Sequence, residues 1–105
     1  MSEEKKTKKI KIELKEDVAQ GHYVNLPIIG YSQAEFILDF IKVIPGVTKA
    51  DVKARMILAP MHTKNLLLTL NAKIKEYEKK FGKIALPKQK IEPRNIKLPD
   101  DALPN

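Results

Sequence analysis

The chain has 105 residues, 20 Lys and Arg, 13 Asp and Glu, and no cysteine. Its length fits a single domain, and the lack of cysteine excludes disulfides, thiolate metal sites and a cysteine nucleophile. The formal net charge of +7 is spread along the chain, because residues 1–9 contribute +2, residues 10–82 contribute +3 and residues 83–105 contribute +2. Without a secretory signal or a membrane-spanning run, the protein is expected in the cytoplasm.

Residues 8–15, KKIKIELK, alternate apolar and charged side chains. The apolar positions are Ile10, Ile12 and Leu14, and the charged ones are Lys9, Lys11, Glu13 and Lys15. This period of two predicts a first strand with one apolar face and one charged face that is exposed to water. The charged residues 1–7 before it are expected to form a disordered tail, and residues 16–21 after it a turn or short connection.

Residues 22–32, HYVNLPIIGYS, carry β-branched and aromatic side chains at both odd and even positions. The sequence therefore predicts a second strand whose two faces are both apolar. Pro27 has no N–H to give to a strand ladder, so we expect it at a sheet edge or a bulge.

Residues 33–44 fit both a helix and a strand. Ser32 followed by Glu35 matches a helix capping box, whereas the residues after them are almost all apolar. We favour a strand, because the run is short, rich in Ile, Phe and Val, and ends at a Pro-Gly turn. In that strand Asp39 lies in an apolar row, so its carboxylate needs an exposed position or a partner, and a nearby Lys or Arg is favoured over a catalytic role.

Residues 50–59, ADVKARMILA, alternate again and predict a fourth strand, paired antiparallel to the third through a short loop. Pro60 suits the first turn of a helix. From there an apolar residue recurs at steps of three and four, at Leu66, Leu70, Ile74, Tyr77 and Phe81. This spacing predicts an amphipathic helix from Pro60 to Phe81 that ends at Gly82.

Residues 85–105 contain four of the seven prolines, which excludes a helix or a central strand there. We expect a disordered or extended tail, with an arm laid on a neighbouring subunit as the alternative.

The central part of the chain resembles a known family. The segments that carry the resemblance are GHYVNL (21–26), YSQAEFILDF (31–40), IPGV (44–47), VKARMIL (52–58), APMHTKNLL (59–67) and YEKKFGKI (77–84). Together they resemble short bacterial and archaeal proteins catalogued as a domain of unknown function, and the resemblance implies no activity, cofactor or catalytic residue. That family usually has Ser or Thr before the helix proline. Ala59 is a poor N-cap, so we expect the first turn of the helix to fray or to be capped in another way.

No catalytic, cofactor-binding or metal-binding motif emerges from the sequence. His22 and His62 have no second ligand at metal-binding spacing, and the four glycines are too scattered for a phosphate-binding loop. We therefore predict no enzyme activity, no cofactor and no metal. With only two arginines, contact with nucleic-acid phosphates is the weaker alternative. Its candidate residues are Lys64, Lys73 and Lys80.

Residues 8–84 are therefore predicted to form one α+β domain, a four-stranded antiparallel β-meander followed by one amphipathic helix. The helix can cover only one face of the sheet, so we predict a homodimer or higher even oligomer with a two-fold axis. The candidate interface residues are Tyr23, Leu26, Ile28, Ile37, Ile41 and Val43. The chain resembles the export chaperone SecB in this arrangement alone. The expected function is a non-enzymatic protein-interaction or adaptor module with an unknown protein partner; weak, non-specific nucleic-acid binding is the alternative.

Overall fold

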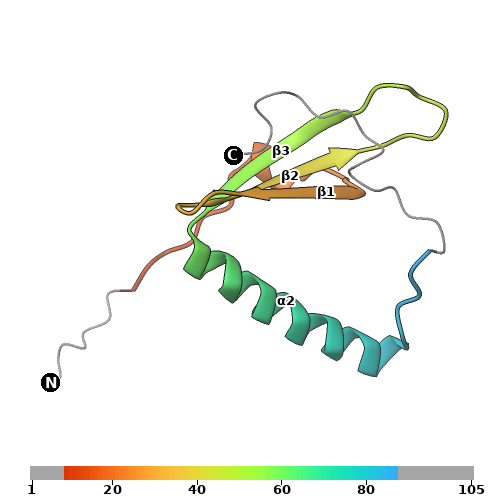
Figure 1. The fold of residues 1–105 in the computed structure, drawn as a ribbon. Coiled ribbons are helices and arrows are strands. Elements are labelled where there is room, and N and C mark those ends of the chain that lie inside the picture. The colour runs from red at the N-terminus through yellow and green to blue at the C-terminus, as the bar shows by residue number, and fades with distance from the viewer. Residues whose placement is uncertain (1–8, 88–105) are drawn as a thin grey trace, which may run out of the picture.

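A computed structural model describes residues 9–87 and shows one sheet and one long helix (Figure 1). The elements are α1 (Glu16–Ala19), β1 (Leu26–Tyr31), β2 (Phe36–Lys42), β3 (Asp51–Leu58) and α2 (Pro60–Phe81). The α+β class and both ends of the long helix are confirmed. The predictions for residues 1–7 and for most of 85–105 lie outside the described residues.

The three strands form one antiparallel sheet in the order β1-β2-β3. Residues 32–35 connect β1 to β2 by a turn in which the Ser32 N–H donates to the Glu35 carbonyl at 2.9 Å. The Ser32 hydroxyl accepts from the Ala34 N–H at 3.2 Å, so it organises a tight turn and does not cap a helix. Of the two alternatives for residues 33–44, the strand is confirmed.

The open end of the β1–β2 hairpin is held by one side-chain amide. Asn25 donates from Nδ2 to the Val43 carbonyl at 2.9 Å and accepts the Val43 N–H on Oδ1 at 2.8 Å. The amide thus extends the ladder by one step beyond Leu26. Pro27 lies on β1, which is an edge strand of this sheet, and this confirms the expected edge position.

The pairing of β2 with β3 contains a bulge. Phe40 lies opposite Ala54 and Ile41 opposite Val52, so Lys53 is an extra residue on β3. Before the bulge the register places Asp39 opposite Arg55. Directly opposite residues of an antiparallel pair project from the same face of the sheet, so these two side chains can meet.

The register divides the sheet into two faces. The first, which we call the ion-pair face, carries Leu26, Ile28, Ile37, Asp39, Ile41 and Arg55. The second, which we call the aromatic face, carries Ile29, Tyr31, Phe36, Leu38, Phe40 and Met56. The core cluster of Leu26, Ile28 and Ile41, with Val43 packed against it, belongs to the hairpin and its ion-pair face.

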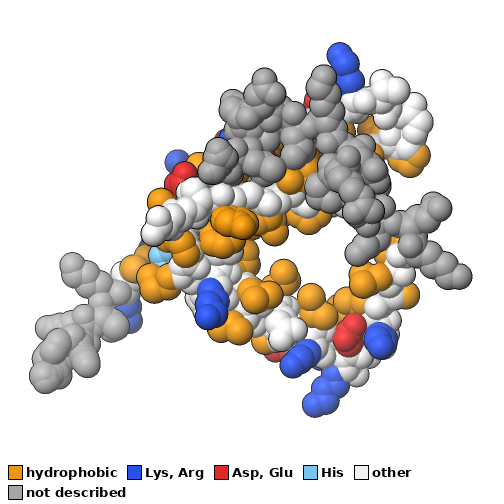
Figure 2. Space-filling model, in the orientation of Figure 1, with side chains coloured by type: hydrophobic (Ala, Val, Ile, Leu, Met, Phe, Trp, Pro, Cys, Tyr) orange, Lys and Arg blue, Asp and Glu red, His pale blue; other side chains and the backbone are white. Residues whose placement is uncertain are grey.

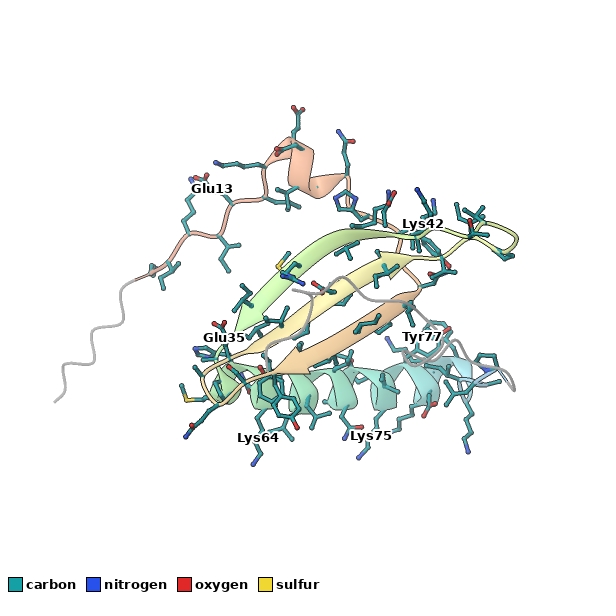
Figure 3. The ribbon with its side chains drawn as sticks, turned by 45° about the horizontal axis from the view of Figure 1, so that its top comes forward. Glu13, Glu35, Lys42, Lys64, Lys75 and Tyr77 are labelled. Carbon is teal, nitrogen blue, oxygen red and sulfur yellow. The ribbon has the colours of Figure 1, made fainter. Side chains whose placement is uncertain are left out.

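Residues 9–15 do not form the predicted first strand, and the sheet of the described residues has three strands. Ile10, Ile12 and Leu14 are 84%, 91% and 70% exposed. Figure 3 shows Glu13 on a stretch that lies apart from the sheet. Alternation makes a segment suitable for a strand, but a strand exists only when a neighbour accepts its backbone hydrogen bonds, and this segment has no such neighbour among residues 9–87.

Helix α2 begins directly after β3 and then runs below the sheet, diverging from it (Figure 1). Its start at Ala59 has no side-chain cap, and Pro60 occupies the first turn. Its end is marked by Gly82, which has a φ of 98° and donates its N–H to the Glu78 carbonyl at 2.9 Å. No residue of α2 is buried, so the expected packing of this helix onto one sheet face is not observed.

Candidate interaction surface

Helix α2 carries a long row of exposed apolar side chains. The residues spaced by three and four along the helix, which we call the α2 stripe, are Leu66, Leu70, Ile74, Tyr77 and Phe81. They are 40%, 53%, 38%, 50% and 71% exposed. Tyr77 and Phe81 contact each other, with ring centroids 5.0 Å apart. In Figure 3 Tyr77 lies on the side of α2 that faces the sheet, whereas Lys64 and Lys75 point away from it.

The N-terminal half of α2 is apolar on further sides as well. Met61, Leu67 and Leu68 are 71%, 63% and 60% exposed. At 3.6 residues per turn, Leu68 projects from the side opposite the stripe. Lys64 shares that side with Leu68, so the side away from the sheet is mixed, yet this half of α2 exposes more apolar surface than one sheet face could cover.

The sheet adds a second exposed apolar surface. On its aromatic face, Ile29, Tyr31 and Met56 are 57%, 66% and 52% exposed. Tyr31 packs against Phe36 across the β1–β2 turn, with ring centroids 5.5 Å apart. Figure 2 shows apolar side chains on the side of the sheet that faces α2 and on the side of α2 that faces the sheet, with open space between them.

A bidentate ion pair joins β2 to β3 within the sheet. Arg55 donates from Nε to Asp39 Oδ1 at 2.7 Å and from Nη2 to Oδ2 at 2.8 Å. The Asp39 side chain is 3% exposed and that of Arg55 is 37% exposed, so the guanidinium reaches from the buried carboxylate toward the surface. The expected basic partner of Asp39 is confirmed, and the pair fixes the register of the two strands.

The candidate interface residues predicted from the sequence occupy three different environments. Leu26, Ile28, Ile37 and Ile41 are buried, at 6%, 3%, 8% and 5% exposure. Val43 is half-buried, and Tyr23 is 76% exposed. Their contact with a second copy stays a prediction. Exposed apolar side chains that a partner reaches without rearrangement include Ile29, Tyr31 and Met56 of the aromatic face and those of α2.

The three candidate phosphate-binding lysines do not share one side of α2. Lys64 and Lys73 are nine residues apart, about two and a half turns, and so project from opposite sides of the helix. Lys73 also pairs with Glu76 at 3.6 Å, and both of these side chains are exposed. The candidate lysines therefore do not form one basic patch on α2, and acidic side chains lie among them.

Within residues 9–87, no three His, Asp or Glu side chains are grouped closely enough to hold a metal ion. None of the helices in the described part of the chain is long and apolar enough to cross a membrane.

Sequence reasoning missed the exposed surface of α2 because it assumed that the helix would be covered by its own sheet. A signal was present in the residues themselves. Met61, Leu67 and Leu68 interrupt the polar side that a helix packed on a single sheet face would present to water.

Comparison with known proteins identifies a family and no individual relative. Residues 1–86 match the family described as "Protein of unknown function (DUF3467)", which confirms the resemblance to a domain of unknown function. No curated protein and no solved structure matches the chain.

Proposed function

Because this chain belongs to the DUF3467 family, which has no established activity, we propose its function from its own surfaces. We propose a non-enzymatic protein-interaction module that works as a homodimer or higher even oligomer. The observation that carries this proposal is α2, a helix of 22 residues without a single buried one. Residues 9–87 contain five buried hydrophobic residues, whereas more than four times as many large hydrophobic ones are exposed.

The free energy of the exposed surface favours association. Burying a large aliphatic or aromatic side chain contributes about 1.5–3 kcal/mol, so completing the burial of half-exposed residues yields about 1 kcal/mol each. The five residues of the α2 stripe together then supply about 5 kcal/mol per protomer by the same rule. Monomeric soluble proteins rarely leave apolar patches of this extent open to water.

The chemistry of the surface favours protein over nucleic acid as the partner. The apolar side chains of α2 are contiguous along the helix, whereas its candidate lysines are divided between opposite sides. Binding to phosphates weakens steeply as salt rises from about 50 to 200 mM, because counterions are released. Association through apolar side chains has no such salt dependence.

The test is sedimentation velocity of the full chain, over a dilution series, at both salt concentrations. We expect a dimer or higher even oligomer at micromolar concentration whose stability is the same or greater in high salt. A monomer throughout the series would contradict the proposal. Association that appears only with added nucleic acid, and disappears in high salt, would support phosphate binding by the lysines in its place.

A further inference from the structure

Two parts of this chain lack a neighbour for their backbone hydrogen bonds within residues 9–87. The first is residues 9–15, which we call the N-terminal arm, and the second is the outer edge of β3. Every residue from 9 to 23 is exposed, so the rest of the described chain buries neither the arm nor α1. Figure 3 shows the arm, at Glu13, apart from the three strands. The arm therefore has the pattern of a strand without a sheet.

Of the two edges of the sheet, that of β3 is the better acceptor of an added strand. An edge strand directs the N–H and C=O groups of every second residue outward. On β1 this row is broken at Pro27, because a proline in an edge strand turns its side without a donor toward solvent. Strand β3 contains no proline, and its residues 54–58, after the bulge, pair with β2 in unbroken register.

The arm fits residues 54–58 in one antiparallel register. The three residues of this stretch on the aromatic face are apolar, and Arg55 lies between two of them on the ion-pair face. The arm also has three alternating apolar residues, with Glu13 between two of them. When Glu13 lies opposite Arg55, all three apolar residues of the arm project from the aromatic face. The resulting pairs are Ile10 with Leu58, Ile12 with Met56, and Leu14 with Ala54.

Charge and the bulge disfavour the other registers. A shift by one residue turns the lysines of the arm onto the aromatic face. A shift by two residues places Lys11 or Lys15 opposite Arg55, and like charges directly opposite each other are destabilising. A parallel arm with Glu13 beside Arg55 would carry Ile10 back beyond the bulge at Lys53, where the alternation of the two faces changes.

The position of the arm in the chain favours a second copy as the owner of the edge. The arm precedes β1, which lies at the opposite edge of the sheet from β3. To reach its own β3, the connection would have to cross the whole sheet, yet residues 16–23 are all exposed. Each chain has one arm and one open β3 edge, so two copies can exchange arms about a two-fold axis.

We infer that residues 9–15 of one copy add to the outer edge of β3 in a second copy as an antiparallel fourth strand. Main-chain hydrogen bonds form the ladder, and the alternating side chains set its register. The partner's Ile12 then covers Met56, which is 52% exposed in the single chain. This inference rests on the proposed self-association and names one contact within it, separate from the α2 stripe.

Cysteine crosslinking of the full chain tests this register, because the chain has no cysteine of its own. Opposite residues of an antiparallel pair have Cα atoms about 4.5–5.5 Å apart, and a disulfide needs about 4.4–6.8 Å. Tagged I12C is co-expressed with untagged M56C, and the purified protein is oxidised with copper–phenanthroline. We expect a mixed disulfide dimer well above the amount that either variant forms alone. I10C with L58C tests the same register at a second pair.

K11C with M56C is the matched control, because Lys11 is the neighbour of Ile12 but projects from the other face of the sheet. This pair should give no mixed dimer. The double variant I12C/M56C tests for pairing within one chain, since an intrachain disulfide leaves a monomer on the denaturing gel whose mobility changes on reduction. We expect disulfide-linked dimers of the double variant. Sedimentation velocity first establishes that each variant retains the oligomeric state of the unaltered chain.

The outcomes separate the exchanged arm from its alternatives. An intrachain disulfide in the double variant, without mixed dimers, would place the arm on its own β3 and overturn the inference. Equal crosslinking of K11C and I12C to M56C would overturn the register. An oligomer by sedimentation with no crosslink at either pair would overturn the inference as well, while leaving the proposed self-association intact. A monomer by sedimentation would remove both.

Discussion

The β1–β2 hairpin and helix α2 are built from similar apolar residues at regular spacing, yet only the hairpin buries them within the chain. Leu26, Ile28 and Ile41 are 6%, 3% and 5% exposed, whereas Ile74, the least exposed member of the α2 stripe, is 38% exposed. The period of a hydrophobic pattern indicates which kind of element a segment suits. It does not determine whether the partner of that element belongs to the same chain.

The difference follows from where the backbone N–H and C=O groups of each element find their hydrogen-bond partners. A strand needs a neighbour for its hydrogen bonds, so β1 and β2 form only together and bring their side chains into contact. A helix satisfies its own interior N–H and C=O groups, so α2 can form without touching another element. Most helical stability in proteins nevertheless comes from tertiary packing, and a second copy would supply it for α2.

The largest effect should come from unpairing the ion pair within the sheet. Arg55→Leu leaves the buried Asp39 carboxylate without the guanidinium and should lower the free energy of unfolding by about 4 kcal/mol. The double variant Asp39→Leu/Arg55→Leu should recover most of the loss, since an apolar pair replaces a buried charge. Urea denaturation measures both. If the double variant is no more stable than Arg55→Leu, the ion pair is not the cause.

The next largest effect should come from the core of the hairpin. Ile28→Ala opens a cavity in the cluster with Leu26 and Ile41 and should cost about 3 kcal/mol of unfolding free energy. Because these contacts lie within one chain, the cost should be the same at every protein concentration. A cost that grows with protein concentration would place Ile28 in the interface between copies, as the sequence predicted.

The same truncation in α2 should behave differently. Ile74→Ala should weaken the dimer by about 2 kcal/mol, about 1 for each copy and roughly 30-fold in its dissociation constant, because the part of Ile74 that is exposed in one chain is covered only between copies. Sedimentation equilibrium measures this change, with Lys75→Ala as the neighbouring control that should leave the constant unchanged. Equal effects of the two substitutions would argue against the stripe as the interface.

The smallest effect should come from the amide that closes the hairpin. Asn25→Ala removes two hydrogen bonds to Val43 and should lower the unfolding free energy by about 1 kcal/mol, since the freed backbone groups can bond to water. Asn25→Asp keeps an acceptor for the Val43 N–H but turns a carboxylate oxygen toward the Val43 carbonyl, so it should lose at least as much. Amide exchange at Val43 would report the change directly. Unaltered exchange there would show that the side chain does not hold this end of the ladder.

The sequence predicts α2 to the residue because its signals are local. Pro60 at the start, Gly82 after the end and the spacing between them each act within one or two turns. The partner of Asp39 was predictable in kind for a similar reason, since a carboxylate within an apolar row requires a cation. Its identity as Arg55 depended on the β2–β3 register, which the sequence does not encode locally.

Residues 9–15 show where sequence reasoning failed. Their alternation is as regular as that of β3, but pairing is a long-range property, and the described residues provide no strand beside them. The exposed α2 stripe was missed for the same reason. The hydrophobic pattern of a segment specifies an apolar face that must be buried. Which residues bury that face depends on how distant elements, or separate chains, pack together.

The most direct test of the account is hydrogen exchange of the full chain as a function of protein concentration, read separately for β2 and α2. We expect the amides of α2 to lose protection on dilution, in step with dissociation measured by sedimentation, while those of β2 keep theirs. Protection of α2 that does not change on dilution, in a chain that sediments as a monomer, would contradict the claim that a second copy covers this helix.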